Sequence, residues 1–287
     1  MLEKSALYVV ATPIGNLNDI SLRALSILAE VDVIAAEHIQ NSRHLLMAHS
    51  ISTQLIALHQ HNETAIAEKI LTFLATGKTI ALITDAGTPG ISDPGAILVN
   101  RVREAGYRII PIPGANAAVC ALSVAGITHP HFLFYGFLPT KSGMRQRELA
   151  ALKSHQCALI FYEAPHRILE CVIDMVSTLG EERQLIIARE LTKLFETIHV
   201  CRLGEALVWL QADANQQKGE FVLLVSGAEV MDKAEMSEQS QHVLRCLLAD
   251  LPLKQAVKLA TEITGENKNT LYRWALSLKN GKLHDQS

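Results

Sequence analysis

The first 115 residues alternate short apolar runs with amphipathic helical patterns. The run Ile80-Ala81-Leu82-Ile83 is continuously apolar, which is typical of a parallel strand buried on both faces. Ser21 is a good N-cap for a helix that begins at Leu22. We expect strands at 7–11, 31–36, 79–83 and 108–112, with further helices at 64–76 and 96–105. This alternation predicts one doubly wound α/β domain over residues 1–115.

A second α/β unit is expected over residues 116–230, with the same mixture of patterns. Its predicted strands are 132–135, 158–162, 184–189 and 221–225, and its predicted helices are 115–125, 166–179 and 204–212. Residues 228–238 are polar enough for a linker. Residues 238–287 then read as a helical tail, in which Pro252 suits the first turn of the second helix and Gly265 ends it. A third helix at 268–279 makes this tail resemble a helix-turn-helix.

Composition narrows the function classes. The chain has 287 residues, is 49% hydrophobic and has a formal charge of −3, so it is not a generally basic nucleic-acid coat protein. No apolar run is long enough to span a membrane, and the N-terminus does not have the pattern of a signal peptide. The five cysteines are far apart and form no C-x-x-C pair. We therefore expect a cytoplasmic enzyme.

The most informative segment is the loop after the strand at 79–83. Its sequence, DAGTPGISDPG at 85–95, contains three glycines and two prolines. Ligands of open α/β sheets bind beyond the carboxyl ends of the strands, and glycines let the backbone approach them closely. The loop is also longer than an ordinary βα connection. We interpret it as a binding loop.

Several common chemistries find no support. The chain has neither a G-x-G-x-x-G nor a G-x-x-x-x-G-K-[ST] pattern, which argues against a Rossmann dinucleotide site and a P-loop. Ser92 resembles the serine of a nucleophile elbow, but Pro94 stands where that motif needs glycine. His59 and His61 lack a third ligand at metal-binding spacing, so no metal is expected.

Motifs along the whole chain resemble one enzyme superfamily. They are YVVATPIGNLNDISLRAL at 8–25, ALHQHNE at 57–63, ITDAGTPGISDPG at 83–95, PIPGANAAVCALSVAGI at 111–127, GFLPTKSGMRQREL at 136–149, FYEAPHRI at 161–168, ARELTKLFETIH at 188–199 and KGEFVLLVSG at 218–227. They are similar to the tetrapyrrole-methylase-type (class III) S-adenosylmethionine (SAM) methyltransferases. Within that superfamily the chain resembles the family of ribosomal RNA small-subunit (cytidine-2′-O-)-methyltransferases.

The resemblance implies an α/β fold: two αβα domains with the cofactor SAM in the cleft between them, plus a small C-terminal helical domain. It also implies a homodimer that methylates a cytidine ribose in 16S rRNA of the small ribosomal subunit. By analogy with the superfamily, the expected cofactor contacts, mostly through main chain, are Pro13, Ala86, Gly87, Thr88, Ile91, Glu163, Leu191 and Glu220.

A ribose hydroxyl is only weakly acidic, so its methylation benefits from a general base or a charge partner. The candidates near the expected cleft are Glu37, Asp93, His166 and Glu190, with Glu163 as a further carboxylate, and the sequence does not choose among them. Lys141, Arg167 and Lys193 are expected to hold phosphate or carboxylates. The other candidate RNA contacts are Arg145, Lys258, Lys268 and Arg273.

One segment departs from the family pattern. Where the family has Ala-Glu-Asp-Thr-Arg after the second strand, this chain has Ala36-Glu37-His38-Ile39-Gln40. This departure keeps open a non-catalytic homologue that binds SAM or RNA. A methylase of a tetrapyrrole-type small molecule is the other alternative, and the basic helical tail argues against it.

Overall fold

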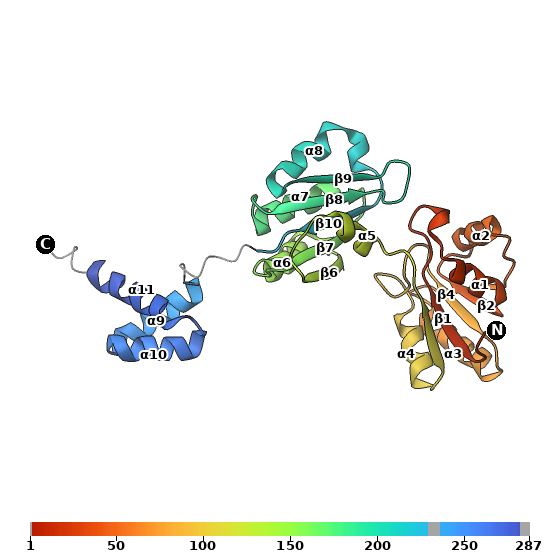
Figure 1. Cartoon of the computed structure of the whole chain (residues 1–287), viewed down its shortest axis with the longest axis horizontal. Coiled ribbons are helices and arrows are strands. Elements are labelled where there is room, and N and C mark those ends of the chain that lie inside the picture. Colours follow the sequence, from red (N-terminus) through yellow and green to blue (C-terminus); the bar gives the residue numbers. More distant parts are fainter. Residues whose placement is uncertain (1, 229–235, 282–287) are drawn as a thin grey trace. The chain divides into compact units, whose positions relative to one another are not determined.

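The computed structural model describes residues 2–228 and 236–281, without the side chains of residues 279–281. The chain divides into two compact units, residues 1–228 and 229–287 (Figure 1). The first unit contains both sheets, and the second is helical. The predicted linker at 228–238 and the end of the predicted tail, residues 282–287, lie largely outside the described residues, as do residues 229–230 of the second predicted domain. The boundary near residue 115 remains a prediction.

The first sheet is entirely parallel, with strand order β3-β2-β4-β1-β5. Its strands are β1 (Ala6–Val10), β2 (Val33–Ala36), β3 (Leu55–Ala57), β4 (Ile80–Ile83) and β5 (Arg108–Ile112). Because side chains alternate between the faces of a strand, Tyr8 belongs to one core layer and Leu7 to the opposite one. The domain is thus doubly wound, as the alternation of patterns predicts.

Helices cover both faces of this sheet. Helices α1 (Leu22–Glu30) and α2 (Ile39–Ala48) pack on one face, and α3 (Glu63–Ala75) and α4 (Ala96–Glu104) pack on the other. The hydroxyl of Ser21 accepts a hydrogen bond from the Ala24 N–H, which confirms the predicted N-cap. The sequence did not predict α2, because its residues 39–48 mix polar and apolar positions without a wide stripe.

The second sheet is mixed, with strand order β6-β7-β10-β8-β9. Its strands are β6 (Phe132–Phe137), β7 (Ala158–Glu163), β8 (Gln184–Arg189), β9 (Thr197–Arg202) and β10 (Phe221–Val225). Strand β10 is antiparallel to both of its neighbours, which places it at the centre of the sheet. Strand β9, which the sequence did not predict, is an edge strand with alternating burial.

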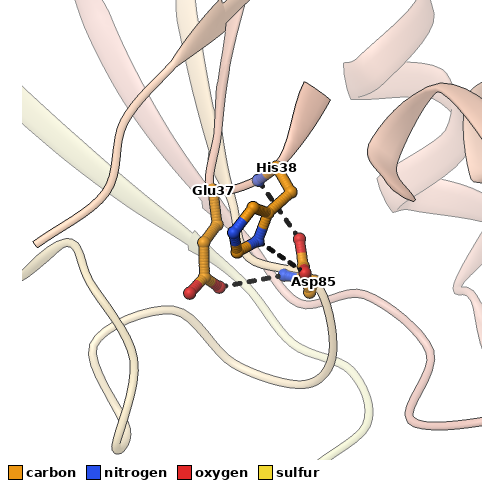
Figure 2. Close-up of side chains that lie close together, drawn as sticks. All are labelled: Glu37, His38 and Asp85. Carbon is orange, nitrogen blue, oxygen red and sulfur yellow. Dashed lines mark hydrogen bonds and ion pairs between the residues drawn. The ribbon is translucent and has the colours of Figure 1, made fainter. Parts of the chain in front are cut away.

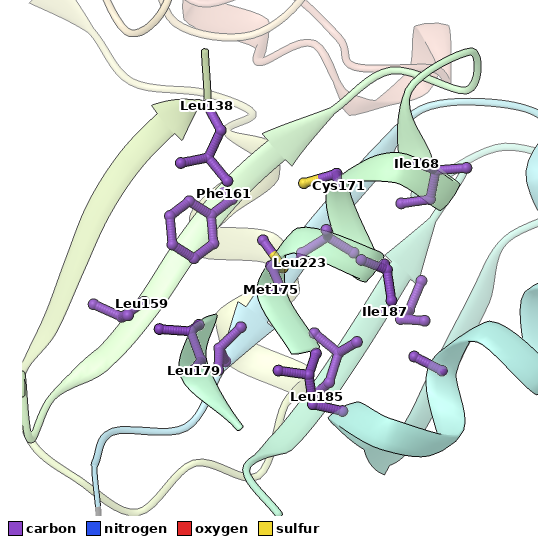
Figure 3. Packing of buried hydrophobic residues seen from close by; sticks show 14 of the residues in the cluster. Leu138, Leu159, Phe161, Ile168, Cys171, Met175, Leu179, Leu185, Ile187 and Leu223 are labelled. Carbon is purple, nitrogen blue, oxygen red and sulfur yellow. The ribbon is translucent and has the colours of Figure 1, made fainter. Parts of the chain in front are cut away.

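Four helices flank the second sheet. Helices α6 (Ser142–Leu152), α7 (Ile168–Leu179) and α8 (Ala206–Ala212) share one core with the sheet, part of which is drawn in Figure 3. Phe161, Met175 and Leu223 are fully buried in that core. Helix α5 (Ala117–Val124) packs on the opposite face. The predicted helix at 204–212 begins as a 3-10 turn at Leu203–Glu205, and α6 was not predicted.

The C-terminal unit contains α9 (Glu238–Asp250), α10 (Leu253–Thr264) and α11 (Lys268–Gly281) around a small core that includes Leu244, Val257 and Leu271. Gly265 ends α10, as predicted, and it has the left-handed conformation common at helix C-termini. Pro252 is the N-cap, one residue before the first turn. In the described parts of the chain, no helix combines the length and apolar character needed to cross a membrane.

Candidate functional site

A cleft of about 280 Å³ lies between residues of the two sheets. Its first wall is the loop after β4, and the bridge between Thr12 and Gly87 holds that loop against the end of β1. The hydroxyl of Thr88 donates to the carbonyl of Ala115 at 3.1 Å. The second wall comes from the ends of β7 and β8 and the start of β10. The long glycine-rich loop therefore lies at a cavity, where the sequence placed a binding loop.

The cleft brings together most of the predicted cofactor residues. Those that line it are Ala86, Gly87, Thr88, Ile91, Glu163, Leu191 and Glu220. Pro13 instead lines a neighbouring cavity. Apolar and aromatic side chains complete the lining, among them Ile14, Phe137 and Tyr162. The Tyr162 hydroxyl accepts a hydrogen bond from the Ala118 N–H at 3.1 Å, which fixes the ring in the wall.

Two of the candidate carboxylates line the cleft: Glu163, whose Oε1 pairs with Arg167, and Asp93. Its burial, together with the negative charges of Glu37 and Asp85, raises the pKa of Asp93 to about 7. A carboxylate with such a pKa is able to accept a proton near neutral pH. Glu37 is thus close enough to act on Asp93 electrostatically. His166 is exposed and does not line the cleft.

Glu190 lies behind the second wall and has a structural environment. Its Oε1 accepts hydrogen bonds from Lys193 Nζ at 2.8 Å and from the Glu220 N–H at 2.9 Å. Burial tends to raise the pKa of Glu190, but these hydrogen bonds and the positive charges of Lys193 and Arg189 outweigh it and lower the pKa. Lys193 also binds Glu220 at 2.7 Å, so its ammonium holds carboxylates.

Sequence reasoning missed the contacts of Asp85. Figure 2 shows this residue with Glu37 and His38 beside the first sheet. Asp85 Oδ1 accepts the His38 N–H at 3.2 Å, and its Oδ2 lies 2.8 Å from the ring nitrogen Nδ1 of His38. The Asp85 N–H donates to Glu37 Oε2 at 3.4 Å. The departure His38-Ile39-Gln40 therefore begins with an ordered contact to the binding loop. No local sequence pattern indicates this contact, because residues 38 and 85 are distant in sequence and meet only in the folded structure.

Glu37, His38 and Asp85 also offer one ligand atom each within 4.8 Å of one another, the spacing of a metal site. The hydrogen bonds just described account for this proximity without a cation. The expectation that the chain binds no metal remains a prediction.

The predicted RNA contacts occupy different environments. Lys141, Lys258, Lys268 and Arg273 are exposed. Arg145 is 1% exposed and forms an ion pair with Asp174 at 2.6 Å. Arg167 is half-buried, pairs with Glu163 at 3.2 Å and donates to the carbonyl of Leu138 at 2.6 Å. The positions of these two arginines give them structural roles and do not support direct contacts with RNA.

Two families match the chain. Residues 6–207 match the tetrapyrrole (corrin/porphyrin) methylases, and residues 234–279 match the RsmI C-terminal HTH domain. The ribosomal RNA small subunit methyltransferase I of Escherichia coli is 48% identical over 270 residues, 94% of each chain. The protein of the same name from Pseudomonas aeruginosa is 48% identical over 276 residues, 96% of this chain and 98% of that one. The chain therefore belongs to the tetrapyrrole methylase family, in its ribosomal RNA small subunit methyltransferase I branch.

Solved structures support the fold. The cobalt precorrin-4 methyltransferase CbiF matches with a TM-score of 0.59 at 16% identity and covers 77% of this chain and 95% of its own. The methyltransferase CobJ matches with a TM-score of 0.58 at 20% identity, with 77% and 94% covered. At these identities the likeness concerns the fold alone, which is the predicted pair of α/β domains.

Proposed function

We propose that this methyltransferase transfers a methyl group from SAM to the ribose 2′-hydroxyl of a cytidine in 16S rRNA. The observation that carries the proposal is a cleft with apolar walls from both sheets, whose lining includes the carboxylate of Asp93 with a pKa raised to about 7. The substrate class is supported by relatives that are 46–48% identical over nearly the whole chain and are named for ribosomal RNA. We further propose that it works as a cytoplasmic homodimer.

The lining of the cleft fits SAM. The side chains of Ile91, Phe137 and Leu191 offer apolar cover of the kind that an adenine ring needs. The backbone of Ala86 and Thr88 offers donors and acceptors for the amino-acid end, and Gly87, with φ of +80°, leaves it uncovered by a side chain while its own N–H and carbonyl bond to Thr12. When bound, SAM supplies an electrophilic methyl group on a positively charged sulfur.

Asp93 is the general base of the proposal. With a pKa of about 7, it is substantially ionised at neutral pH and basic enough to take a proton from the ribose hydroxyl in the transition state. General-base catalysis of this kind contributes about 10²–10⁴-fold to a rate. The rigid walls contribute the alignment of oxygen, methyl carbon and sulfur, which the transfer requires.

The C-terminal unit is the proposed RNA-binding element. It matches a helix-turn-helix family and exposes Lys258, Lys268 and Arg273. Cations of this kind contact phosphates without reading sequence, and their contribution falls as salt rises. Replacing all three residues by glutamine is expected to weaken binding of small ribosomal subunits and to flatten its salt dependence, with SAM affinity unchanged.

The alternatives receive less support. The two solved methyltransferases compared above, CbiF and CobJ, are 16% and 20% identical to this chain and cover 77% of it. A non-catalytic homologue was suggested by the departure at His38, but this residue is tied to the cleft loop through Asp85, and Asp93 is in place.

The test is transfer of tritium from labelled SAM to small ribosomal subunits that lack the modification, followed by mass spectrometry of the RNA nucleosides. The expected product is one 2′-O-methylcytidine per subunit, and Asp93→Asn should lose most of the transfer. If the protein binds SAM in calorimetry but labels neither subunits nor free 16S rRNA, the proposed substrate is wrong.

A further inference from the structure

A second cavity, of about 260 Å³, adjoins the cleft. The two cavities share Ile14, Ala86, Lys193 and Glu220. Seven of the eight residues expected to contact the methyl donor line the cleft, and methyl transfer also requires a place for the acceptor beside the donor. A neighbouring cavity that shares a wall with the cleft could place the acceptor next to the methyl donor.

Helix α2 supplies much of the second cavity. Asn41, His44 and Leu45 all line it, and their spacing of three and four residues places them on one face of the helix. Asp85 holds the start of this helix, since its Oδ1 accepts the His38 N–H and its Oδ2 accepts a hydrogen bond from Asn41 Nδ2 at 2.6 Å. The helix and the cleft loop therefore form one continuous wall.

The polar groups of this cavity suit a base and a ribose better than a phosphate. Asp85 and Glu220 present carboxylates, which repel a phosphate. Asp85 is bonded to His38 and Asn41 and Glu220 Oε2 to Lys193, but carboxylate oxygens have further lone pairs that accept hydrogen bonds from an exocyclic amino group such as N4 of cytosine. The ammonium of Lys193 is already held between Glu190 and Glu220. His44 is exposed at this cavity and offers a flat ring of the kind on which unstacked RNA bases pack.

Lys193 lies where the two cavities meet. Its side chain covers Gly15, where an added Cβ would lie 2.5 Å from Lys193 Cγ. Residue 15 follows the end of β1 and residue 193 follows the end of β8, so the contact joins the two halves of the site. The glycine is needed for this close approach.

We propose that the second cavity binds the base and ribose of the acceptor nucleotide, and that the shared residues mark the passage to the methyl donor. This inference rests on the proposed function. In the transfer, the ribose 2′-oxygen forms a bond to the methyl carbon while the carbon–sulfur bond breaks with its electron pair left on sulfur. The 2′-hydroxyl reaches the cleft through this passage, and its proton goes to the carboxylate of Asp93, which lines the cleft.

The experiment compares variants of the two cavities with the full chain, small ribosomal subunits and SAM. His44→Ala, in the second cavity alone, should raise the KM for subunits about tenfold, as expected for loss of one base contact, with an unchanged Kd for SAM in calorimetry. Ile91→Ala, in the cleft alone, should weaken SAM binding more than it changes the KM for subunits. Met47→Ala, exposed on α2 and outside both cavities, is the matched control and should change neither.

Three results would overturn the inference while leaving the proposed function intact. In the first, His44→Ala keeps the wild-type KM for subunits. In the second, His44→Ala loses as much SAM affinity as Ile91→Ala does. In the third, Met47→Ala raises the KM for subunits as much as His44→Ala does. Wild-type protein that methylates no subunits would instead overturn the proposed function and this inference with it. Thermal melts of all three variants identify any loss of folded protein.

Discussion

The two walls of the cleft place carboxylates in opposite electrostatic environments. On the first wall, burial and the charges of Glu37 and Asp85 raise the pKa of Asp93 to about 7. On the second, hydrogen bonds from Lys193 and the Glu220 N–H outweigh burial and lower the pKa of Glu190. When the environments of two carboxylates shift their pKa values in opposite directions, one is suited to exchange a proton and the other to stay charged. Asp93 is suited to take up a proton, and Glu190 to stay charged and hold the wall together.

The backbones of the walls differ in the same sense. On the first wall, positive φ angles fall mostly on glycines, at Gly87, Gly90 and Gly95. On the second, Gly219 (φ +89°) is joined by Glu190 (φ +53°) and Thr192 (φ +66°), whose side chains disfavour this conformation. The N–H of Glu190 bonds to the Glu220 carbonyl at 3.0 Å, and the N–H of Lys193 to the Glu190 carbonyl at 3.0 Å. Hydrogen bonds thus help to hold the non-glycine residues of the second wall at positive φ, whereas the glycines of the first wall have no side chain that disfavours positive φ.

The variant expected to have the largest effect on the contrast between Asp93 and Glu190 is Asp93→Asn. Removal of the proposed general base should lower the methyl-transfer rate by about 10²–10⁴-fold. Because the base works when ionised, the wild-type rate should rise with pH up to about 7 and then level off, and the variant should lose this dependence. Single-turnover transfer to small ribosomal subunits at several pH values measures both effects.

Glu190→Gln serves as the control for that experiment, since its carboxylate lies behind the other wall. It should keep the wild-type shape of the pH–rate profile. If the pH–rate profile changed in Glu190→Gln but not in Asp93→Asn, Glu190 and not Asp93 would be the proton acceptor.

Of the variants considered for the two walls, Gly219→Ala should lose the most stability. Gly219 has φ of +89°, and an added Cβ would lie 2.5 Å from Glu190 Cδ. A left-handed alanine costs about 1–2 kcal/mol, and displacement of the Glu190 hydrogen bonds should add roughly 1–3 kcal/mol. Denaturant unfolding gives the free energy of unfolding.

Gly77→Ala is the matched variant for this prediction. Gly77 has φ of +86°, but nothing lies within 4 Å of its added Cβ, so only the backbone cost applies. Equal losses in the two variants would show that the Glu190 contact adds nothing to stability.

The same contrast explains what the sequence predicts well. Strands β5, β8 and β10 have the predicted bounds, because apolar residues dominate them and turn residues delimit them. The loop at 85–95 was predicted to border a binding site because its glycines and prolines indicate an unusual backbone conformation, and it does line the cleft. The edge strand β9 was missed because Ile198 and Val200 are exposed there, while the alternate residues face the protein.

Side-chain roles at the site were harder to predict, because they depend on partners distant in sequence. In the sequence, Arg145 and Lys258 are both simply positive charges. In the structure, Arg145 is buried and pairs with Asp174 on another helix, whereas Lys258 is exposed. The tie between His38 and Asp85 joins residues 47 positions apart. Nothing local to His166 shows that it lies outside the cleft.

Glu190→Gln should itself lower the free energy of unfolding at pH 7 by about 1.5–3 kcal/mol, the value of hydrogen bonds to a charged group. The sign with pH follows from the lowered pKa in the folded state. The stabilisation is present above the ordinary pKa of 4.5 and is lost as pH falls through the lower folded value. The difference between wild type and variant should therefore shrink below about pH 4.5, which denaturant titrations at pH 7 and pH 3.5 measure. A difference that does not depend on pH would mean that the charge of Glu190 does not stabilise the second wall.

The smallest expected effect is a gain of stability in Asp93→Asn. The folded pKa of about 7 exceeds the ordinary 3.8, so the folded state binds more protons between these values and the wild type loses stability as pH rises through them. Asparagine carries no charge and avoids this loss. Because Asp93 is only partly buried and water screens its charge, we expect the variant to be more stable by about 1 kcal/mol at pH 8 and nearly equal to the wild type at pH 4. Parallel urea titrations at the two pH values measure the difference. A variant that loses both stability and activity would make Asp93 a structural carboxylate like Glu190, whereas gained stability with lost activity identifies a charge that the fold tolerates for its chemistry.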